Sequence, residues 1–199
     1  MEREEQELNK LFDFFREIDK EKLIGRQTFL ADGSRKENDA EHAWHMAIMA
    51  FVLQEYANET VDVLRVMKMV LMHDLVEIYA GDTYAYDESG KETQRERELA
   101  AADRIFGMLP EDQGKEFRTI WDEFEEKKTP EAKFARMLDN YQPLSLNNAN
   151  QGGDWRAHNV ARSQVEKRNE ISKEGSQVMG QVIADIIEEN VRKGNLRDA

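Results

Sequence analysis

The segment Val70–Asp82 carries residues whose types and spacing could do chemistry. His73 and Asp74 stand side by side in an otherwise apolar run of valine, leucine and methionine. A carboxylate buried among such residues is very unfavourable unless another group compensates its charge. A divalent cation would compensate it, and so would a neighbouring arginine or backbone donors. The residues alone therefore leave metal ligation and plain packing evenly balanced.

Two further carboxylates follow in the same segment. Glu77 lies four residues after His73 and three after Asp74, so a helix would place the three side chains on one side. A solvated helix face is the simpler explanation of Glu77, although its neighbours are apolar. Asp82 follows Gly81, where that helix should end, and on its own it is a turn residue.

Two candidate ligands lie on other predicted helices. His42 stands four residues before Met46 on an apolar stripe, so it should face the core. Asp139 ends another apolar stripe and means little alone. Combined with His73 and Asp74, they would form a nitrogen and oxygen donor set suited to Mn, Co, Fe, Ni or Zn, with Mg also allowed. Such a set leaves positions open for water and substrate oxygens.

The composition excludes several classes of protein. The chain has 199 residues, which suits one domain, and a net charge of −13, which repels nucleic-acid polymers and anionic membranes. The absence of cysteine excludes disulfides, thiolate metal sites and a cysteine nucleophile. Because the start of the chain is too acidic for a signal peptide and no long apolar run follows, we expect a cytoplasmic protein.

Helical periodicity dominates the chain, and no stretch alternates convincingly at period two. We expect an all-α bundle with Pro143 kinking or ending its helix and with a polar loop at 82–91. The expected helices cover about 2–18, 38–56, 60–81, 92–107, 111–127, 130–149, 154–171 and 173–192. The pattern predicts a single domain over 1–199, with a core at about 38–145 and C-terminal helices at about 154–192 packing on it.

These motifs resemble the HD-domain phosphohydrolase superfamily, and most closely its small 5′-deoxynucleotidases. Residues 37–42 read Glu-Asn-Asp-Ala-Glu-His, where the family has Glu-Asn-x-Ala-Glu-His. Residues 73–82 match the family pattern His-Asp-x-x-Glu-x-x-x-Gly-Asp without a gap. The resemblance covers about residues 10–145. It implies an HD-type helical domain with one divalent metal held by His42, His73, Asp74 and Asp139.

The resemblance also implies roles for residues around the metal. Glu77 and Asp82 would be the acid/base and water-positioning residues, without a decision on which is the acid. Arg26 would hold the substrate phosphate. Gln27 stands where some members have a tryptophan that stacks on the base, which leaves the nucleoside preference open. Ile78 stands where the nucleotide-tetraphosphate hydrolases have a second acid, which argues against that activity.

The expected activity is metal-dependent hydrolysis of (deoxy)nucleoside 5′-monophosphates to nucleoside and phosphate. One alternative is an HD hydrolase of a cyclic nucleotide or a nucleoside triphosphate, and another is a non-catalytic metal- or nucleotide-binding helical module. The expected partner is a small phosphorylated substrate rather than a nucleic-acid polymer or a membrane. The family resemblance favours a homodimer, and the phenylalanine-rich first helix and the apolar last helix could meet a partner chain.

The segment 88–97 is rich in charged residues and directly follows the site segment. A charged surface loop is the simpler interpretation. The alternative is a mobile lid whose Lys91 or Arg95 approaches the substrate.

Overall fold

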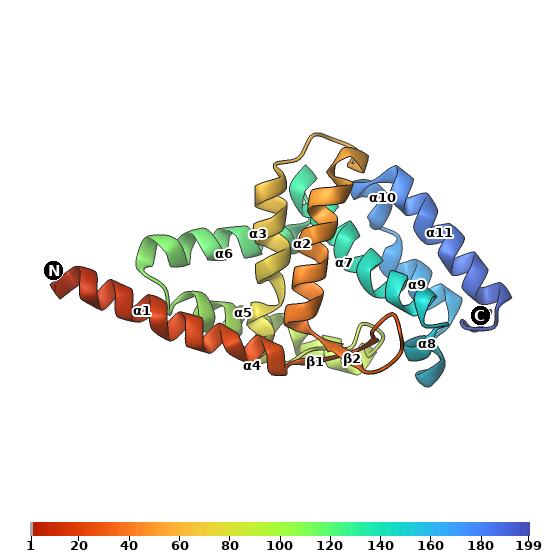
Figure 1. The fold of residues 1–199 in the computed structure, drawn as a ribbon, viewed down its shortest axis with the longest axis horizontal. Coiled ribbons are helices and arrows are strands. Elements are labelled where there is room, and N and C mark those ends of the chain that lie inside the picture. The colour runs from red at the N-terminus through yellow and green to blue at the C-terminus, as the bar shows by residue number, and fades with distance from the viewer. Residues whose placement is uncertain (1) are drawn as a thin grey trace.

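A computed structural model describes residues 2–199, apart from the side chains of residues 2, 3, 88, 89 and 91 (Figure 1). Helices account for most of it, so the predicted all-α class is confirmed. The α-helices are α1 (Glu2–Ile18), α2 (Asp39–Leu53), α3 (Val63–Met72), α4 (Glu77–Ala80), α5 (Glu88–Phe106), α6 (Glu111–Glu126), α7 (Pro130–Ala149), α8 (Gly153–Ala157), α9 (Arg162–Asn169), α10 (Ser172–Gly175) and α11 (Gln177–Arg192). The 3₁₀ turns are η1 (Asp19–Leu23), η2 (Gln54–Tyr56) and η3 (His73–Val76).

A small sheet forms where the sequence indicated only irregular structure. Strand β1 (Gly25–Phe29) pairs antiparallel with β2 (Lys36–Asn38), with Gly25 opposite Asn38 and Phe29 opposite Lys36. The expectation of no strand is wrong here. In β1 only Thr28 is buried, so the alternation that marks a half-buried strand is missing, and β2 has just three residues.

Helix α7 is the element around which the others pack. It contacts α2, α3, α6, α10 and α11, and eleven of its side chains are buried. Thr129 caps its N-terminus by accepting a hydrogen bond from the Ala132 N–H, with Pro130 at the first helical position. The helix continues past Pro143 to Ala149, so it does not end at the proline. Packing on several sides compensates for the one backbone hydrogen bond that a proline removes.

The start of α2 is set by a local hydrogen-bond exchange. The Asn38 side chain accepts from the Glu41 N–H, and the Glu41 side chain accepts from the Asn38 N–H, which is a capping box. With the helix beginning at Asp39, His42 falls in its first turn and is buried. The sequence thus fixes the position of one candidate ligand through the cap.

Three predicted boundaries are wrong in an informative way. The expected helix over 60–81 is divided into α3, the 3₁₀ turn η3 and α4. The expected helix over 154–171 is divided into α8 and α9. Helix α5 begins at Glu88 rather than near 92, so residues 88–91 are helical and not part of a loop. In the first two cases the apolar periodicity runs through a change of backbone geometry that it does not record, and in the third the helix begins in a polar stretch without apolar periodicity.

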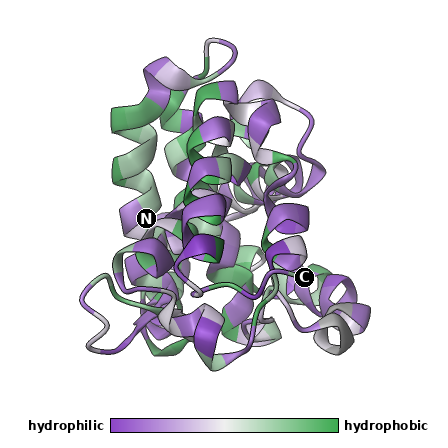
Figure 2. Cartoon of the chain, turned by 90° about the vertical axis from the view of Figure 1, so that its right-hand side faces the viewer, coloured by the Kyte–Doolittle hydropathy of each residue, from purple (hydrophilic) through white to green (hydrophobic). Residues whose placement is uncertain are grey.

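Two groups of buried side chains form the core. The larger one lies between α2, α3, α6 and α7, and the smaller one joins α7 to α8, α9 and α11 through residues such as Leu144, Trp155 and Ile183. Figure 2 shows that the helices mix hydrophobic and hydrophilic residues, as amphipathic helices around a core do. Among the described residues no helix has the length and apolar character to cross a membrane. The single domain over 1–199 stays a prediction.

Candidate metal centre

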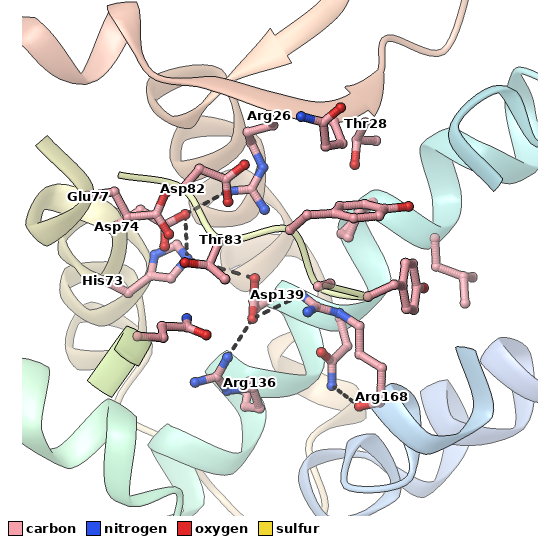
Figure 3. A pocket seen from close by; sticks show the side chains of 18 of the residues that line it. Arg26, Thr28, His73, Asp74, Glu77, Asp82, Thr83, Arg136, Asp139 and Arg168 are labelled. Carbon is pink, nitrogen blue, oxygen red and sulfur yellow. Dashed lines mark hydrogen bonds and ion pairs between the residues drawn. The ribbon is translucent and has the colours of Figure 1, made fainter. Parts of the chain in front are cut away.

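The four predicted metal ligands come together from three elements, and Figure 3 shows His73, Asp74 and Asp139 among them. His42 lies in α2, His73 and Asp74 lie in η3, and Asp139 lies in the middle of α7. His42 Nε2 is 3.2 Å and His73 Nε2 3.8 Å from Asp139 Oδ1. Asp74 Oδ2 lies 3.0 Å from His73 Nε2 and 3.9 Å from His42 Nε2. One ligand atom each of His42, His73 and Asp139 lies within 4.8 Å of the others, a spacing that could hold a metal ion.

Hydrogen bonds on the far side of each ring aim both histidines at this point. His42 Nδ1 lies 2.8 Å from Gln142 Oε1, and His73 Nδ1 lies 2.9 Å from the Val70 carbonyl oxygen. Both acceptors require a proton on Nδ1, so each Nε2 faces the centre and can bind a metal there when it carries no proton. Trp121 Nε1–H donates to the His73 carbonyl oxygen at 3.1 Å and holds the 3₁₀ turn in place. Outer contacts of this kind are typical of metal-binding histidines.

The donor atoms fit a divalent cation. His73 Nε2 is buried and has no hydrogen-bond partner, although Asp74 and Asp139 lie close. Burial lowers the pKa of His73, but the charges of Asp74 and Asp139 outweigh it and raise the pKa to about 10. Burial and the charge of Arg26 instead lower the pKa of His42 to about 4. Without a metal, a proton on His73 Nε2 thus lies where a metal cation would bind, between two histidine nitrogens and two carboxylates.

Two acids stand beside the donor set. Glu77 opens α4, and its Oε2 is buried without a hydrogen-bond partner. Burial and the charges of Asp74 and Asp39 raise the pKa of Glu77 well above its ordinary value. Burial raises the pKa of Asp82 as well, against the opposing charge of Arg26. Both carboxyl groups line the same cavity as the ligands, which is where acid/base residues of a hydrolase must lie.

An arginine that sequence reasoning missed fixes the segment before and after Asp82. Arg97 in α5 donates to the Ala80 carbonyl oxygen at the end of α4, and to Thr83 Oγ1 at 2.8 Å. It thereby ties the residues on both sides of Asp82 to α5. Its spacing in the sequence gave no signal, because charged residues surround it on a helix that is mostly polar.

Arg26 on β1 reaches the edge of the metal centre. Its Nη1 donates to Asp74 Oδ2 at 2.8 Å and to Asp39 Oδ1 at 3.1 Å, and its Nε lies 3.5 Å from Glu37 Oε1. These carboxylates raise the pKa of Arg26 and so keep it charged. Its side chain is only 12% exposed. In this geometry Arg26 holds a metal ligand, and it also lines the cavity where the predicted phosphate would lie.

A cavity of about 410 Å³ opens beside the centre. Near the ligands its wall carries the predicted Glu77, Asp82 and Arg26. The remaining wall holds groups that sequence reasoning did not single out. They are cationic in one part (Lys127, Arg136 and Arg168) and aromatic in another (Tyr84, Tyr86 and Trp155).

The known proteins that this chain resembles agree with the geometry. A family model described as an HD domain matches residues 18–179. The chain belongs to the HD domain family. A structure titled as a predicted metal-dependent phosphohydrolase from Magnetospirillum magnetotacticum MS-1 is 46% identical, with a TM-score of 0.90 over 96% of this chain and 98% of that one. The PH0347 protein from Pyrococcus horikoshii OT3, 20% identical with a TM-score of 0.63 over 91% and 98% of the two chains, shares the fold.

Curated relatives include proteins named 5′-deoxynucleotidase HDDC2. The human protein is 32% identical over 130 residues, which are 65% of this chain and 62% of that protein. The zebrafish (Danio rerio) protein is 34% identical over 108 residues, or 54% and 52% of the two chains. The match to this chain thus spans less than two thirds of the length of these relatives.

The segment 88–97 of this HD domain is helical rather than a loop. Gln94, Arg95 and Glu98 of α5 line the cavity. Arg95 stacks on the Trp121 ring, 5.1 Å from its centroid, and pairs with Glu125 at 3.4 Å. Arg95 therefore lies at the cavity, whereas the Lys91 side chain lies outside the described residues, and the mobile lid stays a prediction.

Proposed function

We propose that this HD domain hydrolyses (deoxy)nucleoside 5′-monophosphates to nucleoside and phosphate. The proposal rests on one observation: the donor set lies beside a cavity that the acids Glu77 and Asp82 also line. This donor set consists of His42, His73, Asp74 and Asp139. The relatives named 5′-deoxynucleotidase support the reaction class. A bound Mn, Co, Fe, Ni or Zn ion would polarise the phosphoryl group and lower the pKa of a coordinated water.

The protein groups would share the proton transfers of this reaction. Glu77 and Asp82 are the candidates for removing the proton of the attacking water and for protonating the leaving 5′ oxygen. Burial and neighbouring acids raise the pKa of both groups, so each binds a proton more tightly than an exposed carboxyl group does. Arg26, within reach of Asp74, would neutralise phosphate charge next to the metal.

The aromatic part of the cavity supports a nucleoside as the leaving group. The rings of Tyr84 and Tyr86 meet edge to face with centroids 5.3 Å apart, and both line the cavity, as does the largely buried Trp155. The two tyrosine rings would offer a stacking surface in place of the tryptophan that Gln27 replaces. Asn169 lines this part too, and its buried Oδ1 lacks a hydrogen-bond partner, so it can accept one from a base or sugar.

The direct experiment measures phosphate release from deoxy- and ribonucleoside 5′-monophosphates with Mn, Co, Fe, Ni, Zn and Mg in turn. We expect release from monophosphates, and loss of both metal and activity in His42→Ala. Cyclic nucleotides and nucleoside triphosphates serve as parallel substrates. Turnover of these alone would replace the proposed substrate class, and metal retention without any turnover would indicate a binding module.

We also propose that two copies associate through an apolar face on α2 and α3. The side chains of Trp44, Ile48, Phe51, Leu64 and Leu71 are 43–63% exposed. The two helices pack against each other and lie next to one another in Figure 1. Contiguous exposed apolar residues on one face are typical of a protein interface. A cytoplasmic location stays a prediction from the composition.

A further inference from the structure

The cationic part of the cavity wall comes from three separate elements. Lys127 follows α6, Arg136 lies in α7 and Arg168 lies in α9. In Figure 3 Arg136 and Arg168 lie on the other side of Asp139 from Arg26. The chain has a net charge of −13, and acids such as Glu125 and Asp139 line the cavity beside these three cations. Cations that protein carboxylates leave unpaired in such a cavity favour an anionic ligand.

The carboxylate of Asp139 joins this wall to the metal centre. Its Oδ1 faces His42 Nε2 at 3.2 Å, while its Oδ2 accepts from Arg136 Nη1 at 2.8 Å and lies 3.8 Å from Arg168 Nη2. The Asp139 carboxylate therefore lies between Arg136 and Arg168 on one side and the predicted metal position on the other. An anion with several oxygens could contact both places at once.

The three cations differ in the number of ion pairs and hydrogen bonds that they form with other protein groups. Arg136 is fixed by Asp139, by Glu125 Oε1 at 3.1 Å and by stacking on Phe124, 4.4 Å from its centroid. Arg168 has only the long 3.8 Å contact with Asp139, and within the described residues the Lys127 ammonium has no ion-pair or hydrogen-bond partner. Arg168 and Lys127 are thus the cations that remain free for a ligand.

The backbone at Lys127 is held in an unfavourable conformation. Lys127 ends α6 with φ 58° and ψ 32°, the left-handed region that favours glycine. The charge of Arg136, together with burial, also lowers the pKa of Lys127. Glycine would relieve the backbone strain and remove the like-charge repulsion. Both effects disfavour lysine at this position, so its presence in the cavity wall is best explained by a ligand that it binds.

We propose that Lys127 and Arg168 bind the phosphate group of the substrate, opposite Arg26, while Arg136 positions Asp139. The inference rests on the proposed function and adds residues to it. The non-bridging oxygens that face away from the metal would accept hydrogen bonds from the Arg168 guanidinium and the Lys127 ammonium. The same pair would retain inorganic phosphate after the nucleoside has left.

The experiment compares Lys127→Gly and Arg168→Gln with the wild-type protein loaded with metal. We expect each change to raise the KM for a nucleoside monophosphate and the inhibition constant of inorganic phosphate about tenfold, the loss of one modest contact. Metal content should stay unchanged. Lys127→Gly should keep or raise the melting temperature, because glycine suits the left-handed position.

Lys128→Gln is the matched control. Lys128 is the next residue, is 76% exposed and pairs with Glu126 at 3.2 Å, so its loss should change neither constant. KM and phosphate inhibition within twofold of wild type in both test variants would overturn the inference. Loss of metal in those variants would overturn it as well, because the two cations would then act by positioning the metal ligand Asp139 and not by binding phosphate.

The failure of this inference can be told apart from failure of the proposed function. Calorimetric titration of inorganic phosphate into the metal-loaded protein measures binding without turnover. Wild type that hydrolyses no monophosphate, yet binds phosphate through Lys127 and Arg168, would overturn only the proposed reaction. Hydrolysis with unchanged phosphate binding in the variants would overturn only the inference.

Discussion

At the scale of single residues, the two histidines of the centre differ sharply. His73, with a pKa raised to about 10, carries a proton at neutral pH when no cation is bound, whereas His42, with a pKa lowered to about 4, does not. Protonated His73 adds stability that is fully present below its ordinary pKa of 6.5 and is lost as the pH rises to about 10. A metal ion and this proton therefore compete for one site.

Metal binding should accordingly release a proton. Between about pH 7 and 9 we expect about one proton per metal from His73, and an apparent affinity that rises as the pH rises. Calorimetric titrations of Mn or Co in buffers of different ionisation enthalpy measure the number directly. His158→Gln is the control, because His158 lies outside the ligand set and pairs with Asp154 at 2.8 Å. Binding without proton release would contradict the described state of His73.

Glu77 is the residue whose replacement best separates chemistry from metal binding. Glu77→Gln keeps the shape of the side chain but removes its ability to transfer a proton. We expect kcat to fall by roughly 10²–10⁴-fold while metal content is retained. Glu126→Gln, at an exposed end of α6, is the control. Steady-state kinetics with metal analysis decide the matter, and normal turnover in Glu77→Gln would remove Glu77 from the mechanism.

At the scale of elements, the sequence predicts most helices because their apolar stripes and caps are local. The Asn38 and Thr129 caps set the starts of α2 and α7. The break at His73 is not local, since the Trp121 N–H of α6 meets the His73 carbonyl oxygen. The β1–β2 pair escaped prediction because it buries little and is short.

The same distinction explains which parts of the site could be predicted. His42 and the His73–Asp82 segment carry a contiguous pattern, whereas Asp139 needed the family resemblance. Lys127 directly follows α6 and Arg168 lies in α9, in stretches where charged residues are ordinary. Only the folding of α6, α7 and α9 against one another brings them to one wall, and no spacing in the sequence records that approach.

The contact of α10 with α7 offers a test of how the elements hold the centre. A Cβ added at Gly175 would overlap the Lys133 carbonyl oxygen and lie 2.9 Å from Phe134 Cα. Because backbone rather than a flexible side chain is in the way, Gly175→Ala should destabilise the fold by about 1–3 kcal/mol in urea unfolding. Gly25→Ala is the control, since its Cβ would meet nothing within 4 Å. Equal stability of the two variants would contradict this packing.

At the scale of the whole molecule, the charge is divided between surface and cavity. The chain carries 41 acidic and 28 basic residues, so most of its surrounding field repels anions. Lys127, Arg136 and Arg168 place three positive charges in the cavity wall, among acids that also line it, and a bound metal would add to these charges. An acidic exterior with cations grouped inside a pocket suits a small anion and disfavours nucleic-acid polymers, whose backbone would have to follow the surface.

Among the described residues, exposed apolar side chains gather on α2 and α3 and also on α1. One face is on α2 and α3 and includes Trp44, Phe51 and Leu64, each 61–63% exposed. The other follows α1, where Leu8 and Phe15 are 48% and 55% exposed. The face on α2 and α3 is broader because two packed helices contribute to it, and a stable dimer needs about 800 Å² per partner.

Phe51→Glu should therefore convert a dimer into a monomer. A charge placed at the centre of an apolar interface leaves an uncompensated carboxylate between the copies, which weakens association by several kcal/mol. Light scattering coupled to size-exclusion chromatography reads the mass directly, and Val178→Glu, at an exposed apolar position on α11, is the control. A monomeric wild-type protein would contradict dimerisation itself. A dimer that survives Phe51→Glu but not Phe15→Glu would move the interface to α1, and the α2 and α3 face would then need another partner.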